Sequence, residues 1–159
     1  MTDEKKLKNA QSVYKALCEM LDEKDFHYEK HEEDLTITFG MRGEDMPMQF
    51  VVNIDAGREL VRLLSPVPVI FDEEKRVEAA IATCQINYRL ADGSFDFDFK
   101  SGRVLFRMTS SFTDSLISKE LFLYMLACAS YTVDEYNDKL LMLAKGAIPV
   151  DEFFKRKNS

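Results

Sequence analysis

Residues 92–110, DGSFDFDFKSGRVLFRMTS, hold the pattern that most constrains the fold of this chain. Phenylalanine alternates with aspartate at Phe95, Phe97 and Phe99, and apolar residues alternate again across residues 104–108. Side chains on a strand point to opposite faces in turn, so each run has one apolar face and one polar face. A slip of one residue would move every phenylalanine into water, so the two runs predict a β-hairpin of well-defined register.

The turn of this hairpin is expected at residues 101–102, a serine followed by a glycine. The resulting register pairs Phe97 with Phe106 on the apolar face. On the other face Asp96 lies opposite Arg107, and opposite charges directly across a strand pair contribute about 0.2–1 kcal/mol. The aspartates are then the solvated alternates of a buried row of phenylalanines.

A calcium loop is the competing interpretation of Asp92, Asp96 and Asp98. Such a loop needs glycine at its sixth position and glutamate at its twelfth. Counted from Asp92, these positions hold Phe97 and Arg103. The match fails, and the hairpin explains the whole stretch.

His27 and His31 are the other candidate metal ligands. Their alternation with Phe26 and Tyr28 favours a strand, on which four residues span roughly 13 Å, too far for both imidazoles to reach one ion. We therefore predict a solvated strand face and no metal site.

Motifs for catalysis are missing from the sequence. It contains no glycine-rich phosphate loop, no helical zinc-protease motif, no paired cysteines and no nucleophile elbow. Two histidines and no tryptophan leave few groups for a catalytic constellation. We predict that the protein is not an enzyme and has no catalytic or cofactor-binding residue and no cofactor.

Charge argues against nucleic acid as a partner. The 159 residues carry a formal net charge of −7, which repels a phosphate backbone, and residues 155–157 are only a short basic exception. The longest nearly apolar run, residues 121–131, is far short of the roughly 20 residues that cross a bilayer, and residues 1–11 lack the apolar core of a signal peptide. We expect neither nucleic acid nor a membrane as a partner.

The three cysteines, Cys18, Cys84 and Cys128, are odd in number and lie far apart in the sequence. Each falls in an apolar helical pattern, where cysteine acts as a small hydrophobe in a reducing compartment. The sequence therefore predicts a cytoplasmic protein.

Hydrophobic periodicity divides the chain into three helices and six strands. Apolar residues recur every three or four positions in three segments and every second position between them. The helical stripes run over residues 7–21, 77–88 and 122–143, and the strands are expected at residues 26–30, 35–41, 48–55, 59–65, 95–99 and 104–109.

Two details of this assignment concern the middle of the sheet. A tight turn at residues 56–57 would place Val52 opposite Val61. Pro66 and Pro68 are expected to stop the ladder of the fourth strand, because proline has no N–H to donate.

The second and third helices each carry a regular apolar stripe. In the second helix the stripe is Val77, Ile81, Cys84 and Tyr88. The stripe of the third repeats in heptads, which is compatible either with a long helix lying on the sheet and the first helix or with an intermolecular coiled coil.

The predicted fold class is α+β, an antiparallel sheet of five to six strands with three helices in the order α-β-β-β-β-α-β-β-α. We find no internal repeat or linker, and we expect residues 1–159 to form a single domain with a core of about residues 5–146 and a C-terminal tail of residues 147–159.

A family resemblance rests on the second helix, the hairpin after it and the start of the third helix. Asn87, the entry DGSF at residues 92–95, the turn SGRV at residues 101–104 and the helix start SKEL at residues 118–121 resemble YbjN-like proteins. These are often labelled "putative bacterial sensory transduction regulators" and share the type III secretion chaperone-like fold. The order of elements predicted from periodicity matches that fold over roughly residues 5–146.

The resemblance implies a non-enzymatic protein–protein interaction module, chaperone-like or regulatory, that forms a homodimer and binds another polypeptide. It supplies no catalytic residue. The alternative is a small-molecule-binding sensor domain, or an unrecognised enzyme, with a pocket between the sheet and a helix.

Candidate interaction surfaces come from residues that the ladder leaves over. Unpaired sheet edges can accept a strand from a partner. Val67, Val69 and Ile70 form an apolar cluster beyond the expected end of the fourth strand, and Leu105 lies on the hairpin face opposite the phenylalanines. Each of these four residues either forms an interface or packs under a helix.

Overall fold

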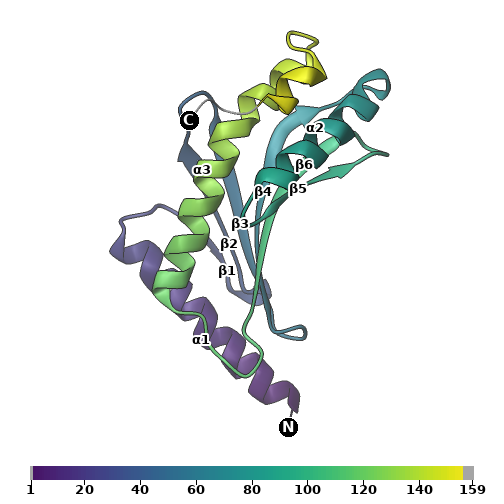
Figure 1. Ribbon diagram of the computed structural model, residues 1–159. Helices are drawn as coiled ribbons and strands as arrows, with labels where there is room; N and C mark the ends of the chain where they lie inside the picture. The colour runs from purple at the N-terminus through teal and green to yellow at the C-terminus, as the bar shows by residue number, and fades with distance from the viewer. Residues whose placement is uncertain (1, 156–159) are drawn as a thin grey trace.

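The computed structural model describes residues 2–155 and confirms the predicted order of elements (Figure 1). Three short 3-10 helices, η1 (Glu32–Asp34), η2 (Glu73–Lys75) and η3 (Val150–Phe154), join or follow the main elements. The main elements are α1 (Thr2–Glu23), β1 (Glu29–His31), β2 (Thr36–Arg42), β3 (Pro47–Asp55), β4 (Leu60–Ile70), α2 (Arg76–Arg89), β5 (Ser94–Asp98), β6 (Arg103–Ser111) and α3 (Lys119–Ala144).

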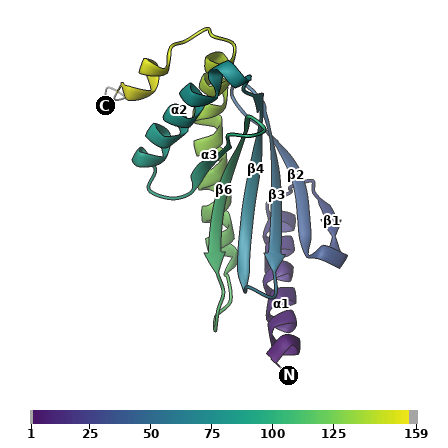
Figure 2. The same ribbon diagram turned by 90° about the vertical axis from the view of Figure 1, so that its right-hand side faces the viewer.

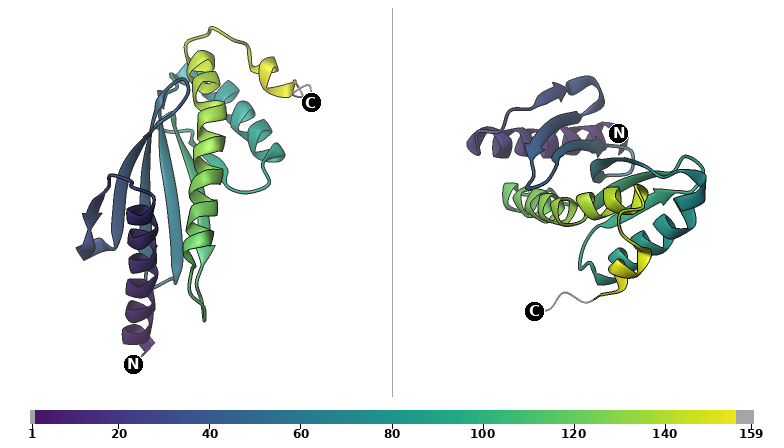
Figure 3. Two further views of the ribbon diagram at one scale, coloured as in Figure 1. Left: turned by 90° about the vertical axis from the view of Figure 1, so that its left-hand side faces the viewer. Right: turned by 90° about the horizontal axis from the view of Figure 1, so that it is seen from above.

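The six strands form one antiparallel sheet in the order β1-β2-β3-β4-β6-β5. Helices α1 and α3 lie across one face of it, and α2 packs at the β5 end (Figures 2 and 3). We call the helix-covered side the inner face and the other side the outer face. Alternate residues of every long strand are buried on the inner face, so the core is a single layer between sheet and helices.

The β5–β6 hairpin forms with the expected faces but with its register displaced by two residues. Phe95 pairs with Phe106 and Phe97 with Val104, so the loop is residues 99–102 and not a two-residue turn. Phe99 lies in this loop and is 56% exposed. A shift of two preserves the face of every side chain, which is why the alternation predicts burial better than it predicts pairing.

Glycine at position 102 explains where the hairpin turns. Its φ is +75°, and a Cβ there would stand 2.2 Å from the carbonyl oxygen of Phe71. The Phe71 N–H donates to the Gly102 carbonyl at 2.8 Å, so the turn lies against the end of β4. Only a residue without a side chain fits this approach.

The β3–β4 connection shows the same two-residue error. Val61 pairs with Ile54 and not with Val52, because residues 56–59 form a four-residue loop where a two-residue turn was expected. Glu59 in this loop has a φ of +52°. The apolar residues still face the core, as predicted.

The prediction that Pro66 and Pro68 end β4 is wrong. The strand continues to Ile70, with its pairing to β6 interrupted between Pro66 and Ile70. Proline leaves the carbonyl of Gln49 on β3 without an N–H partner, and the buried hydroxyl of Ser65 donates to that oxygen at 2.7 Å. A side-chain donor therefore replaces the missing ladder bond.

The buried face of α2 is not its large apolar stripe. Val77, Ile81 and Tyr88 are 59%, 40% and 87% exposed, and Cys84 is exposed as well. The helix instead buries small residues and one isoleucine, which allow it to lie close to the sheet. These are Ala79, Ala82, Thr83 and Ile86.

Helix α3 begins as expected, since the Ser118 side chain accepts the N–H of Leu121 at 3.1 Å. Its heptad stripe is packed within the protein, against β4, β6 and α1, as in the first of the two interpretations. Beyond it, η3 lies against α2 and buries Phe153, so part of the predicted C-terminal tail contributes to the core.

Two phenylalanines of the same hairpin provide a test of this packing. Phe106 is fully buried against Phe95, with ring centroids 5.1 Å apart, whereas Phe99 is mostly exposed. We expect Phe106→Ala to lower the free energy of unfolding by about 3–5 kcal/mol and Phe99→Ala by less than about 0.5 kcal/mol, both measured by urea denaturation. Equal losses in the two variants would contradict the register.

Candidate functional site

The far half of β2 has a strand on one side only. β1 is three residues long and pairs with Thr36–Thr38, whereas β3 pairs with the whole of β2. In the described part of the chain, no strand lies beside residues 39–42 on the β1 side. We call this segment the open edge.

Hydrogen bonds at both ends of β2 show which backbone groups the open edge presents. The N–H of Ile54 donates to the carbonyl of Leu35 at 3.0 Å, and the N–H of Gly43 donates to the carbonyl of Met46 at 3.1 Å. Both N–H and C=O of a strand residue point to the same side, and that side alternates along the strand. The odd-numbered residues therefore bond to β3, and Gly40 and Arg42 direct their N–H and C=O groups away from the sheet.

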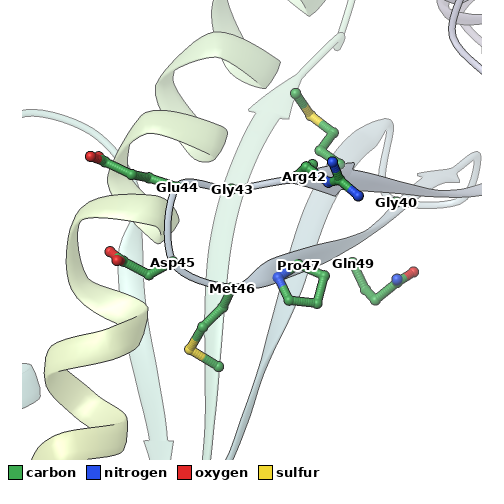
Figure 4. A pocket seen from close by; sticks show the side chains of 9 residues that line it. Gly40, Arg42, Gly43, Glu44, Asp45, Met46, Pro47 and Gln49 are labelled. Atoms are coloured by element: carbon green, nitrogen blue, oxygen red, sulfur yellow. The ribbon is translucent and has the colours of Figure 1, made fainter.

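Two hollows adjoin the open edge, and both are lined by Gly40 and its cross-strand partner Gln49. The larger, about 630 Å³, lies at the β2–β3 hairpin (Figure 4). Its lining is Gly40, Met41, Arg42, Gly43, Glu44, Asp45, Met46, Pro47 and Gln49. The smaller, about 350 Å³, is lined by His27, Tyr28, Glu29, Thr38, Phe39, Gly40 and Gln49.

Gly40 is the residue that makes this region accessible to another backbone. It is exposed and has no side chain, and glycine inside a strand often marks the close approach of a ligand or a second chain. A Cβ at this position would lie 3.1 Å from Nε2 of Gln49. The glycine therefore leaves room for Gln49 at the surface of the hollows.

Asp134 of α3 holds the β2–β3 hairpin in place. Its Oδ1 accepts the N–H of Glu44 at 2.8 Å, across ninety positions of sequence. The approach is so close that a Cβ on Gly43 would lie 2.4 Å from the same oxygen. The end of the open edge is thus hydrogen-bonded to a long helix, and Figure 4 shows the hairpin beside a helix.

The two faces of the open edge differ in polarity. On the inner face the ring of Phe39 stacks on Phe50 at 5.4 Å and meets Phe26 edge-on at 5.9 Å. Gly40 and Gln49 lie on the outer face, in register with each other. An added strand with alternating apolar and polar residues matches both surfaces.

The residues proposed from sequence lie elsewhere, around the interruption between β4 and β6. Val67 and Val69 are buried in the core, Leu105 is half-buried and Ile70 is 59% exposed. Val67 and Leu105 contribute to a third hollow of about 420 Å³, while Val69 and Ile70 do not line it. Its remaining lining is Pro66, Asp96, Phe97, Asp98, Ser101, Arg103 and Val104.

The carboxylates of the hairpin are bound by neighbouring groups. Asp96 accepts from Nε of Arg107 at 2.6 Å, and this bond raises the pKa of the guanidinium. The hydroxyl of Ser101 and the N–H of Lys100 hold the pKa of Asp98 below its usual value. Within residues 2–155, no three His, Cys, Asp or Glu side chains are grouped so that they would hold a metal ion.

The space between the sheet and the helices is filled. The hollow enclosed by α1, α3 and the inner face has a volume of only about 10 Å³, which leaves room for no more than one water molecule. It is lined by Leu17, Met20, Leu21, Phe39, Val52, Val61, Leu63, Phe122, Met125 and Leu126. A small-molecule pocket at this place would require the core to open.

Sequence reasoning predicted unpaired sheet edges that could accept a strand but did not assign one to β2, although a signal was present. Gly40 stands on the polar side of the second strand's alternation and is a residue that weakens strands, and no packing reason for it is visible in the sequence. The shortness of β1 was not visible, because residues 26–30 alternate as a longer strand would.

No helix within residues 2–155 combines the length and the apolar character needed to cross a membrane.

A comparison with protein-family models matches residues 14–142, more than half of the chain, to YbjN, described as "putative bacterial sensory transduction regulator". A search of curated proteins finds no match.

Solved structures share the fold at low sequence identity. A chain in the crystal structure of the ExsC–ExsE complex is 18% identical with a TM-score of 0.55, and the match covers 83% of this chain and 95% of that one. The crystal structure of YbjN from E. coli is 9% identical with a TM-score of 0.55, covering 86% and 95%. The fold is type III secretion chaperone-like, as predicted.

The contact between Asp134 and the hairpin is open to a direct test. We expect Asp134→Ala to speed amide hydrogen exchange at Glu44 at least tenfold, because that N–H loses its charged acceptor. Asp138→Ala, one turn further along α3, is the matched control and should leave Glu44 unchanged. Unaltered protection of Glu44 in Asp134→Ala would show that the hairpin does not depend on this contact.

Proposed function

The chain belongs to the YbjN family, and from this premise we propose that it is a non-enzymatic, chaperone-like or regulatory module that binds another polypeptide. The open edge of β2 is the observation that carries the proposal. Gly40 and Arg42 offer two N–H and two C=O groups in line with β1, which is the arrangement used in recognition by strand addition. The ExsC–ExsE complex, a structural neighbour that by its name contains two proteins, supports a polypeptide as the partner class.

The alternative function is a sensor or enzyme with a ligand between the sheet and a helix. The filled inner space favours the polypeptide, because about 10 Å³ accommodates no metabolite. A thermal-shift panel of divalent metals, nucleotides and metabolites distinguishes the two functions, since a ligand that binds the native state raises the apparent stability. A large stabilisation by one small molecule would support the alternative.

Arg42 provides a test of strand addition that leaves the ladder intact. Its N–H faces away from β3, so Arg42→Pro removes one outward-facing donor without breaking a β2–β3 bond. We expect a polypeptide that co-purifies from native cytoplasm with the wild-type chain to be lost with Arg42→Pro and retained with Arg42→Ala. Equal retention by both variants would show that the partner binds elsewhere.

We also propose that the protein is a homodimer formed through α2. The exposed stripe is symmetric about its centre: Val77 and Tyr88 lie equally far from it, as do Ile81 and Cys84. Two copies in antiparallel orientation would therefore place Val77 of one copy against Tyr88 of the other, and Ile81 against Cys84. Such reciprocal contacts are those of a two-fold interface.

Cys84 makes the dimer measurable. We expect light scattering at tens of micromolar to give the dimer mass for the wild type and the monomer mass for Ile81→Asp, because a buried carboxylate would be desolvated without a partner. A short bis-maleimide should cross-link the wild type and Cys128→Ser but not Cys84→Ser. A wild-type monomer under these conditions would end the dimer proposal.

We further propose a second interaction surface and a cytoplasmic location. The exposed Ile70, with Leu105 and Val67 at the third hollow, is a second surface for a partner. The three cysteines are free thiols, which supports a cytoplasmic location. The domain boundaries that we propose are residues 1–159, a single domain.

A further inference from the structure

Asn87 is part of the sequence resemblance, yet neither the open edge nor the α2 stripe uses it. It lies on α2, and its side chain reaches the backbone of β5. Nδ2 donates to the carbonyl of Phe95 at 2.9 Å, and Oδ1 accepts the N–H of the same residue at 2.7 Å. One side chain therefore occupies both hydrogen-bonding groups of one strand residue.

The N–H and C=O of Phe95 point away from β6, toward the free edge of the sheet. β5 is the last strand, and its only strand neighbour within residues 2–155 is β6. At the far end of β6 the N–H of Phe112 donates to the carbonyl of Glu59, so two-residue alternation directs Phe106 toward β4 and away from β5. Phe95, the partner of Phe106, accordingly faces the free side, where Asn87 meets it.

The primary amide of asparagine has one carbonyl and one NH₂ group in a plane, which reproduces the donor and acceptor of a neighbouring strand residue. Without Asn87, the backbone N–H and C=O groups of both Phe95 and Phe97 would be free at the edge of β5, just as those of Gly40 and Arg42 are at β2. With Asn87 in place, Phe97 is the one described residue of β5 whose backbone N–H and C=O remain free at the edge, next to the hairpin loop. Proteins commonly cover sheet edges in order to prevent unwanted pairing.

We propose that Asn87 closes the β5 edge and thereby restricts strand addition to the open edge of β2. It is a specificity-determining residue for the proposed function, on which this inference rests. The partner class is an extended polypeptide segment, and Asn87 determines which of the two sheet edges receives it.

Hydrogen exchange and self-association of Asn87→Ala test the proposal in an Arg42→Pro background, where β2 has lost one of its two outward-facing donors. A second copy of the chain is the probe for the exposed β5 edge. We expect the Phe95 amide to exchange at least tenfold faster than in Arg42→Pro alone. The Asp96 amide, which points toward β6, should be unchanged. Sedimentation velocity should show species larger than those of Arg42→Pro alone. Gln85→Ala, on the same helix, is the matched control and should change neither quantity.

Two results would overturn the proposal. Unchanged exchange at Phe95 would mean that Asn87 does not protect this backbone, and faster exchange without new association would mean that the edge is closed by something else. If rapid exchange at Asp96 shows that the hairpin has unfolded, Asn87→Leu keeps the branched shape of the side chain without its hydrogen-bonding groups and carries the same two expectations. Both readouts report the β5 edge whether or not a partner binds at β2, so failure of the proposed function is recognised separately by Arg42→Pro capture.

Discussion

The structure depends on one constraint: a six-stranded sheet has its fully buried apolar side chains on one face. Helices α1 and α3 cover that face and α2 packs at the β5 end, so the protein is two layers thick with a single core. Because strand residues alternate both in the face of their side chains and in the direction of their hydrogen bonds, this constraint also determines which backbone groups remain at the two edges. The edges are therefore the places where the backbone remains available to a partner.

The alternation of apolar and polar residues made the fold predictable from sequence, but it did not determine the register in which neighbouring strands pair. Phe95, Phe106 and Val61 are buried as expected, yet both hairpin registers differ by two residues, because a shift of two leaves every strand side chain on the same face. Loop conformation decides between such registers, through positive φ at Glu59 and through the contact of Gly102 with Phe71. These are tertiary contacts that local patterning does not encode.

Helix α2 was mispredicted for a related reason. Its large apolar residues form a regular stripe, and hydrophobicity alone assigns that stripe to the core. The helix packs close to the sheet because alanines lie on its buried face, and the large apolar residues of its stripe are exposed. The family and the fold were accessible from short motifs and element order. The open edge and the role of Asn87 were not, since each depends on which strand lies beside which.

The bond between Asp134 and Glu44 has a consequence for the energetics of recognition. A hairpin end that is mobile in the free protein must lose conformational freedom when a partner binds, and this loss weakens the complex. Here the acceptor strand ends in a hairpin that folding has already anchored to a helix. The ordering cost of this segment then belongs to folding, and more of the interaction free energy of an incoming chain is available as affinity.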